Sequence, residues 1–564
     1  MAEPQHSPPR KRVLIVGAGA AGMSCAHHLA EHPDKFDVTL VEAADYCGGQ
    51  AFSIPLDKAW HGASWLNQGV QGGSNIFHHT MTMFARQGFV ANPVKLQVSF
   101  GKGDQFWTNV FPTKLLERHR GEIRRFVWML KIVRWFEVLF ALVPIKVLMK
   151  LFWFSDEFTN AVALPMVALF LGTGNYTPGV PSIMLERLCT SPTYGMWYPP
   201  DKERIASNLP PMVVFPNLSR FYETWRQDLV KKGVNIRLST EVTQVVSRNK
   251  NGVTVKTIQR TPAPDGHNPS RSQTPQDETT EHYDELVLCC LADTSHRLLL
   301  TTSSLLERLI LSRAKFSNDL TITHTDASYM RRHYETAPPP SQTTTPTPTP
   351  FHPMYFTRQY PSSPSKLDLS FDCTAYQAQF PPPSTLPLDR HVFQTIFLHR
   401  ERDGHLWTDD EIDPAKILRR DAWHQLCHAW THYALVVPWL WLLQGRGRRR
   451  TRFAGSWTVV NAHETAVLSG VAAAVDLGAG YPEDLERDGG GFALMCFRMY
   501  YLLVYGRWYR RRVLGAEEGA TGLGKGLNGS VYCGPGVGEV ERGMWMEERE
   551  RDGGDGEGIK GVNL

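Results

Sequence analysis

Residues 13–53 read VLIVGAGAAGMSCAHHLAEHPDKFDVTLVEAADYCGGQAFS, and this stretch decides the fold. It begins with an apolar run typical of a β-strand buried on both faces, and Gly17, Gly19 and Gly22 follow in the pattern GxGxxG. The next residues have helical composition, and FDVTLVE predicts a second strand that closes at Glu42. A strand, a glycine-rich turn, a helix and a strand ending in an acid predict a Rossmann unit that binds a dinucleotide.

The three glycines have separate physical roles in such a unit. Gly17 allows a tight turn, Gly19 lets the backbone approach a pyrophosphate at the helix N-terminus, and Gly22 lets the helix pack closely on the strand. Glu42 lies 20 residues after Gly22, where an acid binds the adenosine ribose hydroxyls. We therefore expect cofactor contacts from Gly17, Ala18, Gly19, Ala20, Ala21, Gly22, Glu42 and Ala43.

A pair of adjacent glycines indicates whether the expected nucleotide is FAD or NAD. Gly48 and Gly49 follow Glu42 by six and seven residues, and Gln50 comes next. Two adjacent glycines let backbone N–H groups come close to a ligand without a Cβ in the way. FAD proteins of the glutathione-reductase type have such a pair after the acid, whereas dehydrogenases that bind only NAD do not need it. The pair indicates FAD.

With these motifs the chain resembles the flavin-containing amine oxidase superfamily. It is most similar to a branch of predicted FAD/NAD(P)-binding oxidoreductases often found beside cyclopropane-fatty-acid synthases. The resemblance rests on 13–53, 60–73, 215–246 and 452–482, supported by 283–299 and 369–377. It implies an α/β fold: a glutathione-reductase-like FAD-binding Rossmann domain with an interleaved α+β substrate domain, as in amine oxidases.

The resemblance also implies further cofactor contacts. The block that contains Gly69 leads toward the flavin, and the backbone of Val242 meets the adenine. In the last block a helix with a face of small residues lies close to the sheet and points its positive N-terminus at the flavin. The residues placed near the isoalloxazine are Gly455, Trp457, His463 and Glu464. An equally good interpretation of His463 and Glu464 is helix N-terminal capping.

Gln50 departs from the superfamily pattern. Many amine oxidases have arginine after the glycine pair, and this branch often has histidine, so a neutral hydrogen-bonding contact replaces a charged one. The change leaves FAD binding in place and puts amine-oxidase chemistry in doubt. Many amine oxidases place a lysine above the flavin, but no sequence block here identifies such a lysine. No catalytic residue is therefore assigned.

The pattern predicts three FAD-binding segments with substrate-domain segments between them. The FAD-binding segments are 1–85, 212–300 and 451–513, and the third ends in an aromatic, basic helix. The substrate domain comprises 86–211 and 301–450. Low-complexity composition predicts a disordered insertion at 261–280, a disordered loop at 336–350 and a disordered tail at 514–564. A second GxGxxG in this tail, at 524–529, has no strand before it and is interpreted as chance.

Two apolar segments leave alternatives open. Charged residues and Pro144 interrupt residues 124–154, which predict two amphipathic helices with aromatics on the buried side. The alternative is a peripheral contact with an anionic membrane. Residues 497–512 support this alternative, because an apolar aromatic run ends there in Arg507, Arg510, Arg511 and Arg512.

Three histidines follow a helical spacing. His424, His428 and His432 lie at i, i+4 and i+8 and would line one side of a helix. The outer two would lie about 12 Å apart, which is too far for one ion. We expect core or cleft histidines and no metal site. Cys289 and Cys290 are adjacent in a predicted buried strand, and we interpret them as core residues rather than redox partners.

Composition narrows the class of protein. Of 564 residues, 42% are hydrophobic and 21% charged, and the net charge of +4 gives no reason to expect nucleic acid. Nine scattered cysteines without a CxxC pair argue against a disulfide framework and fit a reducing compartment. No apolar stretch precedes the first strand, so we expect a cytoplasmic protein without a signal peptide, whose membrane association is peripheral if it occurs.

The sequence therefore predicts an FAD-dependent oxidoreductase. The resemblance implies hydride transfer from substrate to flavin N5, with dioxygen or another acceptor reoxidising the flavin. Apolar, aromatic-rich segments predict a small hydrophobic substrate, such as a lipid, an isoprenoid or an amine. The alternative is a non-redox flavoprotein that acts as a membrane-associated scaffold. A third hypothesis, an NAD-dependent dehydrogenase, disagrees with the glycine pair and with the block at 452–482.

Overall fold

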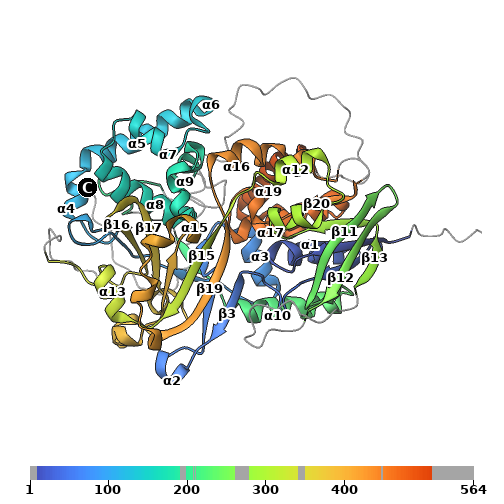
Figure 1. Ribbon diagram of the computed structural model, residues 1–564, viewed down its shortest axis with the longest axis horizontal. Coiled ribbons are helices and arrows are strands. Elements are labelled where there is room, and N and C mark those ends of the chain that lie inside the picture. The colour runs from blue at the N-terminus through green and yellow to red at the C-terminus, as the bar shows by residue number, and fades with distance from the viewer. Residues whose placement is uncertain are drawn as a thin grey trace, which may run out of the picture. The chain divides into compact units, whose positions relative to one another are not determined.

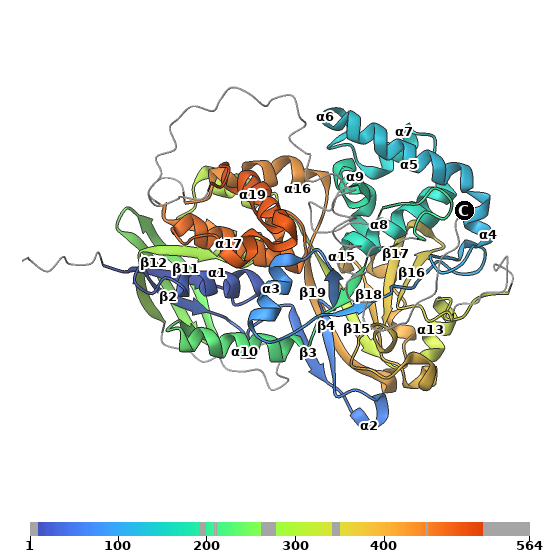
Figure 2. The same cartoon turned by 180° about the vertical axis from the view of Figure 1, so that it is seen from behind.

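The computed structural model describes residues 9–190, 199–207, 209, 211–260, 278–340, 350–445 and 449–510. Figures 1 and 2 show the ribbon from opposite sides. Four predictions fall wholly or largely outside these residues: the second GxGxxG copy, most of the insertion at 261–280, most of the loop at 336–350, and the tail from 514.

A parallel five-stranded sheet forms the centre of the first lobe. Its strand order is β10-β2-β1-β14-β20, and every neighbouring pair is parallel. The strands are β1 (Lys11–Val16), β2 (Phe36–Val41), β10 (Asn235–Arg237), β14 (Glu285–Leu288) and β20 (Thr451–Phe453). These strands come from three separate stretches of the chain, each within one predicted FAD-binding segment. The exact segment boundaries stay a prediction.

Two helices pack closely beside this sheet. The helix α1 (Ala20–Ala30) follows the glycine turn, and α17 (His463–Leu477) lies against it (Figure 1). A Cβ on Gly470 would lie 2.1 Å from the Ala21 carbonyl oxygen, and the Ser24 hydroxyl donates to the Val467 carbonyl at 2.6 Å. The small-residue face of α17 therefore serves close contact with α1.

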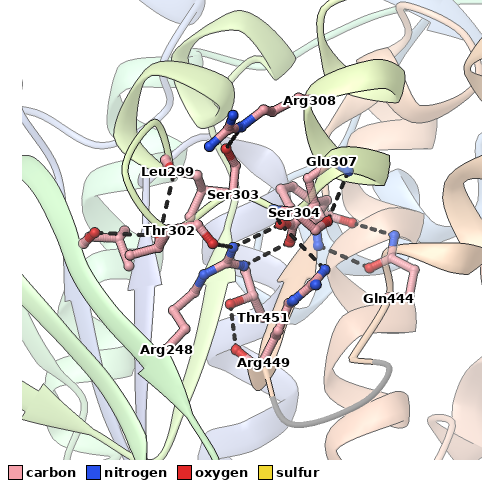
Figure 3. A network of polar contacts seen from close by, with 12 residues as sticks. Arg248, Leu299, Thr302, Ser303, Ser304, Glu307, Arg308, Gln444, Arg449 and Thr451 are labelled. Atoms are coloured by element: carbon pink, nitrogen blue, oxygen red, sulfur yellow. Dashed lines mark hydrogen bonds and ion pairs between the residues drawn. The ribbon is translucent and has the colours of Figure 1, made fainter.

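A three-stranded antiparallel sheet belongs to the first lobe, and a buried ion pair joins it to α12. It consists of β11 (Thr240–Asn249), β12 (Gly252–Gln259) and β13 (Thr279–Tyr283). Arg248 of β11 forms a buried 2.8 Å ion pair with Glu307 of α12 (Leu305–Leu311). Ser304 and Glu307 form a capping box at the start of α12. Figure 3 shows Arg449, before β20, also reaching Glu307, at 3.6 Å.

The second lobe contains a seven-stranded sheet in the order β19-β15-β18-β17-β16-β7-β8. Only the β16–β7 pair is parallel. The strands are β7 (Val98–Phe100), β8 (Trp107–Thr108), β15 (Phe316–His324), β16 (Tyr355–Tyr360), β17 (Ser363–Asp372), β18 (Phe393–Phe397) and β19 (Ile417–Leu426).

Helices gather on one side of this sheet (Figures 1 and 2). They are α4 (Lys114–Arg118), α5 (Arg120–Trp135), α6 (Glu137–Phe140), α7 (Ile145–Leu151), α8 (Leu164–Leu171) and α9 (Ser182–Thr190). The predicted break at Pro144 is observed, because α7 begins immediately after it. The expectation that aromatics face inward is wrong for Trp128, Trp135 and Trp153, which are exposed.

The remaining strands and helices complete the two lobes. The strands are β3 (Ala51–Pro55), β4 (Trp65–Gly69), β5 (Gly72–Ser74), β6 (Asn92–Val94) and β9 (Met212–Val214). The helices are α2 (Lys58–His61), α3 (His78–Arg86), α10 (Leu218–Lys231), α11 (Ala292–Leu298), α13 (Ala327–His333), α14 (Cys373–Tyr376), α15 (Arg400–Asp403), α16 (Trp430–Leu435), α18 (Glu483–Glu486) and α19 (Phe492–Tyr505).

The histidine pattern does not form one helix, so that prediction is wrong. His424 lies in β19, His428 follows this strand, and His432 lies in α16. Backbone pairing of β19 with β15 along its whole length overrides the helical spacing. Burial lowers the pKa of His428 to about 4 and that of His432 to about 3, so both are neutral at pH 7. No cluster of three metal-binding side chains occurs in the described part of the chain.

The aromatic run near residue 500 is largely a core helix. In α19 the rings of Phe497, Tyr501 and Tyr505 are buried, and Arg507 pairs with Asp476. Among the described residues, this segment therefore exposes little apolar surface for the predicted lipid contact. In the described ranges, no helix is both long enough and apolar enough to cross a membrane.

The buried pair of Arg248 and Glu307 yields a stability prediction. Changing Glu307→Ala leaves a buried guanidinium without its main partner and should lower the free energy of unfolding by about 3–5 kcal/mol. Denaturant unfolding followed by circular dichroism measures this change. The double variant R248M/E307L removes both charges and should recover most of the loss. Equal destabilisation of the two variants would contradict this account of the pair.

Candidate cofactor and substrate site

The glycine turn has the geometry that its sequence predicts. Gly17 has a φ of +102°, and a Cβ there would lie 3.1 Å from the Cys289 carbonyl oxygen. A Cβ on Gly22 would lie 1.8 Å from the Gly17 carbonyl oxygen, so no side chain fits. A Cβ on Gly19 would meet nothing within 4 Å. Gly19 thus leaves its space open to a ligand, whereas Gly17 and Gly22 are needed by the fold.

Glu42 ties the end of β2 to this turn. One carboxylate oxygen accepts from the Ala18 N–H at 2.7 Å, and the other accepts from the Ala44 N–H at 2.9 Å. Burial raises the pKa of Glu42, and these backbone N–H groups oppose the rise. Each carboxylate oxygen can accept a second hydrogen bond, so ribose hydroxyls can still bind here.

The glycine pair rests directly on the glycine turn. The Gly48 N–H donates to the Ala18 carbonyl at 2.8 Å, and Gly48 has a φ of +118°. A Cβ on Gly48 would lie 2.5 Å from the Ala51 carbonyl oxygen. A Cβ on Gly49 would approach the Gly19 Cα to 3.5 Å. Two backbone segments therefore meet side by side, without side chains between them.

One cavity of about 660 Å³ extends from this turn to the seven-stranded sheet. This volume is in the usual range for small-molecule and cofactor sites. Its nucleotide end is lined by Gly17, Gly19, Glu42 and Gly48. Its other end is lined mainly by apolar side chains of α8 and the sheet: Leu169, Phe170, Leu171, Tyr355, Leu369, Phe371, Ile396 and Leu398.

Most of the residues predicted to bind the cofactor line this cavity. They are Gly17, Gly19, Ala20, Ala21, Glu42, Ala43, Gly48, Gly49, Gln50, Gly69, Val242, Gly455, Trp457 and His463. Ala18, Gly22 and Glu464 do not line it. Ala18 contributes through its backbone bonds to Glu42 and Gly48, and Gly22 through helix packing. Cys289 and Cys290 are half-buried, pack against the hydrophobic core as expected, and also line the cavity.

His463 and Glu464 have different roles at the start of α17. The Glu464 carboxylate accepts from the His79 and Thr80 backbone N–H groups at 3.0 and 2.8 Å. Glu464 therefore caps α3 rather than its own helix. His463 lines the cavity and bonds to the Tyr222 hydroxyl at 2.7 Å. Burial lowers the pKa of His463 to about 4, so a neutral imidazole stands at this helix N-terminus.

Buried amides join the two lobes beside the cavity. Gln68, in β4, donates to the Thr323 hydroxyl and to the Asp421 carboxylate, both at 2.8 Å. Gln71 lines the cavity and donates to the Gln394 side-chain oxygen at 2.5 Å, and Gln394 donates to Gln68. Gln50 reaches the His424 carbonyl at 3.5 Å. This network fixes the seven-stranded sheet relative to the glycine turn.

A polar cluster at the substrate end was missed by sequence reasoning. Asp319 of β15 is buried and accepts from the His399 backbone N–H at 2.8 Å. His399 bonds to the Tyr176 hydroxyl at 2.7 Å, and the two rings stack. All three side chains line the cavity. No sequence motif links these residues, because 80 or more positions separate the Asp319, His399 and Tyr176 segments.

The cluster carries signs of a functional site. His399 has a φ of +60°, which costs a non-glycine residue about 1–3 kcal/mol. Its Nδ1 is buried and makes no hydrogen bond to any described residue. Burial raises the pKa of Asp319 to about 6 and lowers the pKa of His399. An acid that titrates near neutrality thus lines the cavity and is bonded to the backbone of His399, whose Nδ1 lies 3.7 Å from a Glu401 carboxylate oxygen.

Comparison with known proteins identifies the first segment. Residues 15–86 match the model of the NAD(P)-binding Rossmann-like domain. Polyamine oxidase 1 of Oryza sativa subsp. japonica is 39% identical over 66 residues, which are 11% of this chain and 13% of that protein. Protein anon-37Cs of Drosophila lebanonensis is 32% identical over 72 residues, which are 12% and 13% of the two chains. The chain thus matches about an eighth of the length of these relatives.

Solved structures match the chain over most of its length. A fatty acid isomerase from P. acnes aligns over 82% of this chain and 97% of its own, with a TM-score of 0.52 and 14% identity. A putrescine oxidase aligns over 83% and 99%, with a TM-score of 0.51 and 12% identity. A cyclohexylamine oxidase from Brevibacterium oxydans aligns over 83% and 100%, with a TM-score of 0.50 and 11% identity.

These similarities establish the fold. The chain combines a Rossmann-like lobe with a second lobe arranged as in putrescine oxidase and cyclohexylamine oxidase. The predicted fold class and the resemblance to that superfamily are both confirmed.

The contrast among the three glycines yields a binding prediction. Gly19→Val should fold normally, because its φ of −71° suits any residue and its Cβ meets open space. The valine would occupy the place of the pyrophosphate, so bound flavin per chain should fall at least tenfold. Flavin absorbance of the purified protein and its melting temperature measure the two effects.

A matched substitution separates binding from folding. Gly121→Ala, in α5, also meets open space but lies outside the cavity, so the flavin content should stay unchanged and the melting temperature should not fall. A G19V protein that retains wild-type flavin content would contradict the assignment of this turn to the pyrophosphate.

Proposed function

We propose that this chain, with its flavin amine oxidase fold, is an FAD-dependent oxidoreductase of a small, largely apolar substrate. The single observation that carries the proposal is the cavity. It joins the glycine turn and Glu42 at one end to an apolar sheet face with a few polar groups at the other. One cavity that can hold a dinucleotide and a second molecule is what such a reaction requires.

The nucleotide end fits FAD. The open space at Gly19 suits a pyrophosphate, the Glu42 carboxylate suits ribose hydroxyls, and Val242 lines the same end. The N-terminus of α17 begins at His463 beside the cavity, and its positive dipole end favours negative charge on a reduced flavin. Bound FAD would supply the hydride acceptor, its N5 atom, and dioxygen or another oxidant would then take the electrons.

The substrate end suits an apolar molecule with one polar group. The side chains of Leu369, Ile396 and Leu398 exclude water from this part of the cavity. The Asp319 carboxyl, which lines the cavity, can bind a hydroxyl, an amide or an ammonium group. This combination favours a lipid, an isoprenoid or a hydrophobic amine. No lysine is among the described residues that line the cavity, which supports chemistry different from that of lysine-containing amine oxidases.

The proposal is tested by an absorption spectrum followed by anaerobic mixing. The purified protein should show a flavin spectrum, and one pool among acyl lipids, isoprenoids and amines should bleach it. A flavin spectrum that no pool bleaches would favour a non-redox, structural flavoprotein. A protein that binds no flavin even after FAD is added would refute the proposal.

The raised pKa of Asp319 predicts how the stability of the folded protein changes with pH. Because the pKa of Asp319 is raised from 3.8 to about 6, the folded state loses stability as the pH rises from about 4 to 6. Above pH 6 this loss is about 2–3 kcal/mol. Asp319→Asn removes the buried charge and keeps an oxygen for the His399 N–H. The variant should therefore gain stability at pH 7 and lose this pH dependence, as urea unfolding at several pH values measures.

The same variant should be impaired in function. With a substrate that bleaches the flavin, D319N should reduce kcat/KM about tenfold to a hundredfold, the effect of one hydrogen bond to a charged group. Wild-type kcat/KM should rise with pH through about 6 and then level off, and the variant should lack this rise.

A second buried aspartate provides the control. Asp368 forms a buried 2.5 Å ion pair with Arg358, so Asp368→Asn should destabilise the protein. If D319N also destabilises the protein, or leaves kcat/KM unchanged, Asp319 has a structural role only.

A further inference from the structure

We infer that α5, α6 and α7 form a surface that docks on an anionic lipid bilayer. The surface, here called the apolar face, is made by exposed large hydrophobic side chains within a short stretch of chain. They are Trp128, Trp135, Phe136, Val138, Leu139, Leu142, Val147, Leu151 and Trp153. Val138 is 95% exposed, Trp153 83%, Leu139 73% and Trp135 72%.

The apolar face is additional to the core contacts of the same helices. The buried side of α5 comprises Ile123, Phe126, Met129, Leu130 and Val133, and that of α7 comprises Ile145, Leu148 and Met149. The core therefore needs none of the exposed rings and aliphatic chains. An amphipathic surface helix would carry polar residues at such positions, and a patch of this kind marks an interaction site.

Basic side chains accompany the apolar face. Lys131, Arg134, Lys146 and Lys150 are exposed, and none lies within 4.0 Å of a carboxylate of the described residues. The two acids of the stretch are engaged elsewhere. Glu137 pairs with Arg187 at 2.5 Å, and Glu122 bonds to the Ser155 hydroxyl at 2.9 Å. The exposed charge of this surface is therefore positive.

This combination fits a bilayer better than a protein partner. Aromatic rings prefer the membrane–water boundary, and long basic side chains reach anionic headgroups while their stems stay in apolar surroundings. The cores of protein–protein interfaces are depleted in lysine. The helices are short, since α5 has 16 residues and α7 has 7, so they would lie in the interface plane.

The apolar face lies on the substrate side of the molecule. The helix α7 packs against the turn Gly174–Gly179, which carries the cavity residue Tyr176. Figures 1 and 2 show α5, α6 and α7 in the lobe of the seven-stranded sheet, away from β11–β13. If the proposed function holds, an apolar substrate dissolved in the bilayer would have a short path to its site. The docking itself does not depend on that function.

Vesicle flotation tests the docking without any measurement of activity. Wild-type protein should float with phosphatidylcholine vesicles that contain phosphatidylserine, and less with phosphatidylcholine alone. W135E/V138D places two charges on the apolar face and should abolish flotation. K131A/R134A should weaken binding about tenfold to thirtyfold, the effect of two basic residues near an anionic surface.

Exposed leucines outside the apolar face provide the matched control. Leu300 is 59% exposed and Leu305 80%, so L300D/L305D makes the same kind of change elsewhere. This control should float like wild type, and the melting temperatures of all variants should agree. Wild-type protein that does not float, or W135E/V138D that floats equally well, would overturn the proposal. A wild-type dimer in sedimentation that W135E/V138D splits would identify a second copy as the occupant instead.

Discussion

The site depends on a close approach of two backbone segments. The turn at Gly17–Gly22 and the loop at Gly48–Gly49 meet where the Gly48 N–H donates to the Ala18 carbonyl. The Ala18 N–H in turn donates to the Glu42 carboxylate. Ala18 therefore joins the glycine turn, the end of β2 and the Gly48–Gly49 loop. Side chains at Gly22 or Gly48 would collide with backbone oxygens at 1.8 and 2.5 Å. The cavity exists because these positions lack side chains, and Gly19 leaves its own space for a ligand.

The second constraint is the junction between the lobes. A substrate can react with a bound dinucleotide only if the seven-stranded sheet keeps a fixed distance from the glycine turn. The buried amides of Gln68, Gln71 and Gln394 provide this constraint, because an unpaired buried amide is costly and each has its partner only in this arrangement. The same sheet carries Asp319, whose buried carboxyl reduces stability at neutral pH. Such a cost is commonly retained where a group has a function.

Apolar side chains of this chain have two different environments. Around α17 and α19, apolar and small residues pack inward, and even the aromatic run near residue 500 is largely buried. Around α5–α7, similar side chains remain exposed after the core is complete. The two segments resemble each other in composition, so only their packing partners separate a core helix from a docking surface.

The sequence by itself determined the Rossmann unit and its neighbours at Glu42 and Gly48–Gly49. These features are local, and a missing Cβ or a strand that ends in an acid can be recognised without knowledge of distant residues. Its resemblance to a family also indicated Gly69, Val242, Gly455, Trp457 and His463, which line the cavity. The tertiary structure alone decided that Asp319, His399 and Tyr176 meet, that His424 lies in a strand, that Glu464 caps α3, and that Trp135 is exposed. Each of these outcomes depends on contacts between segments far apart in the chain, and such contacts leave no periodic trace in the sequence.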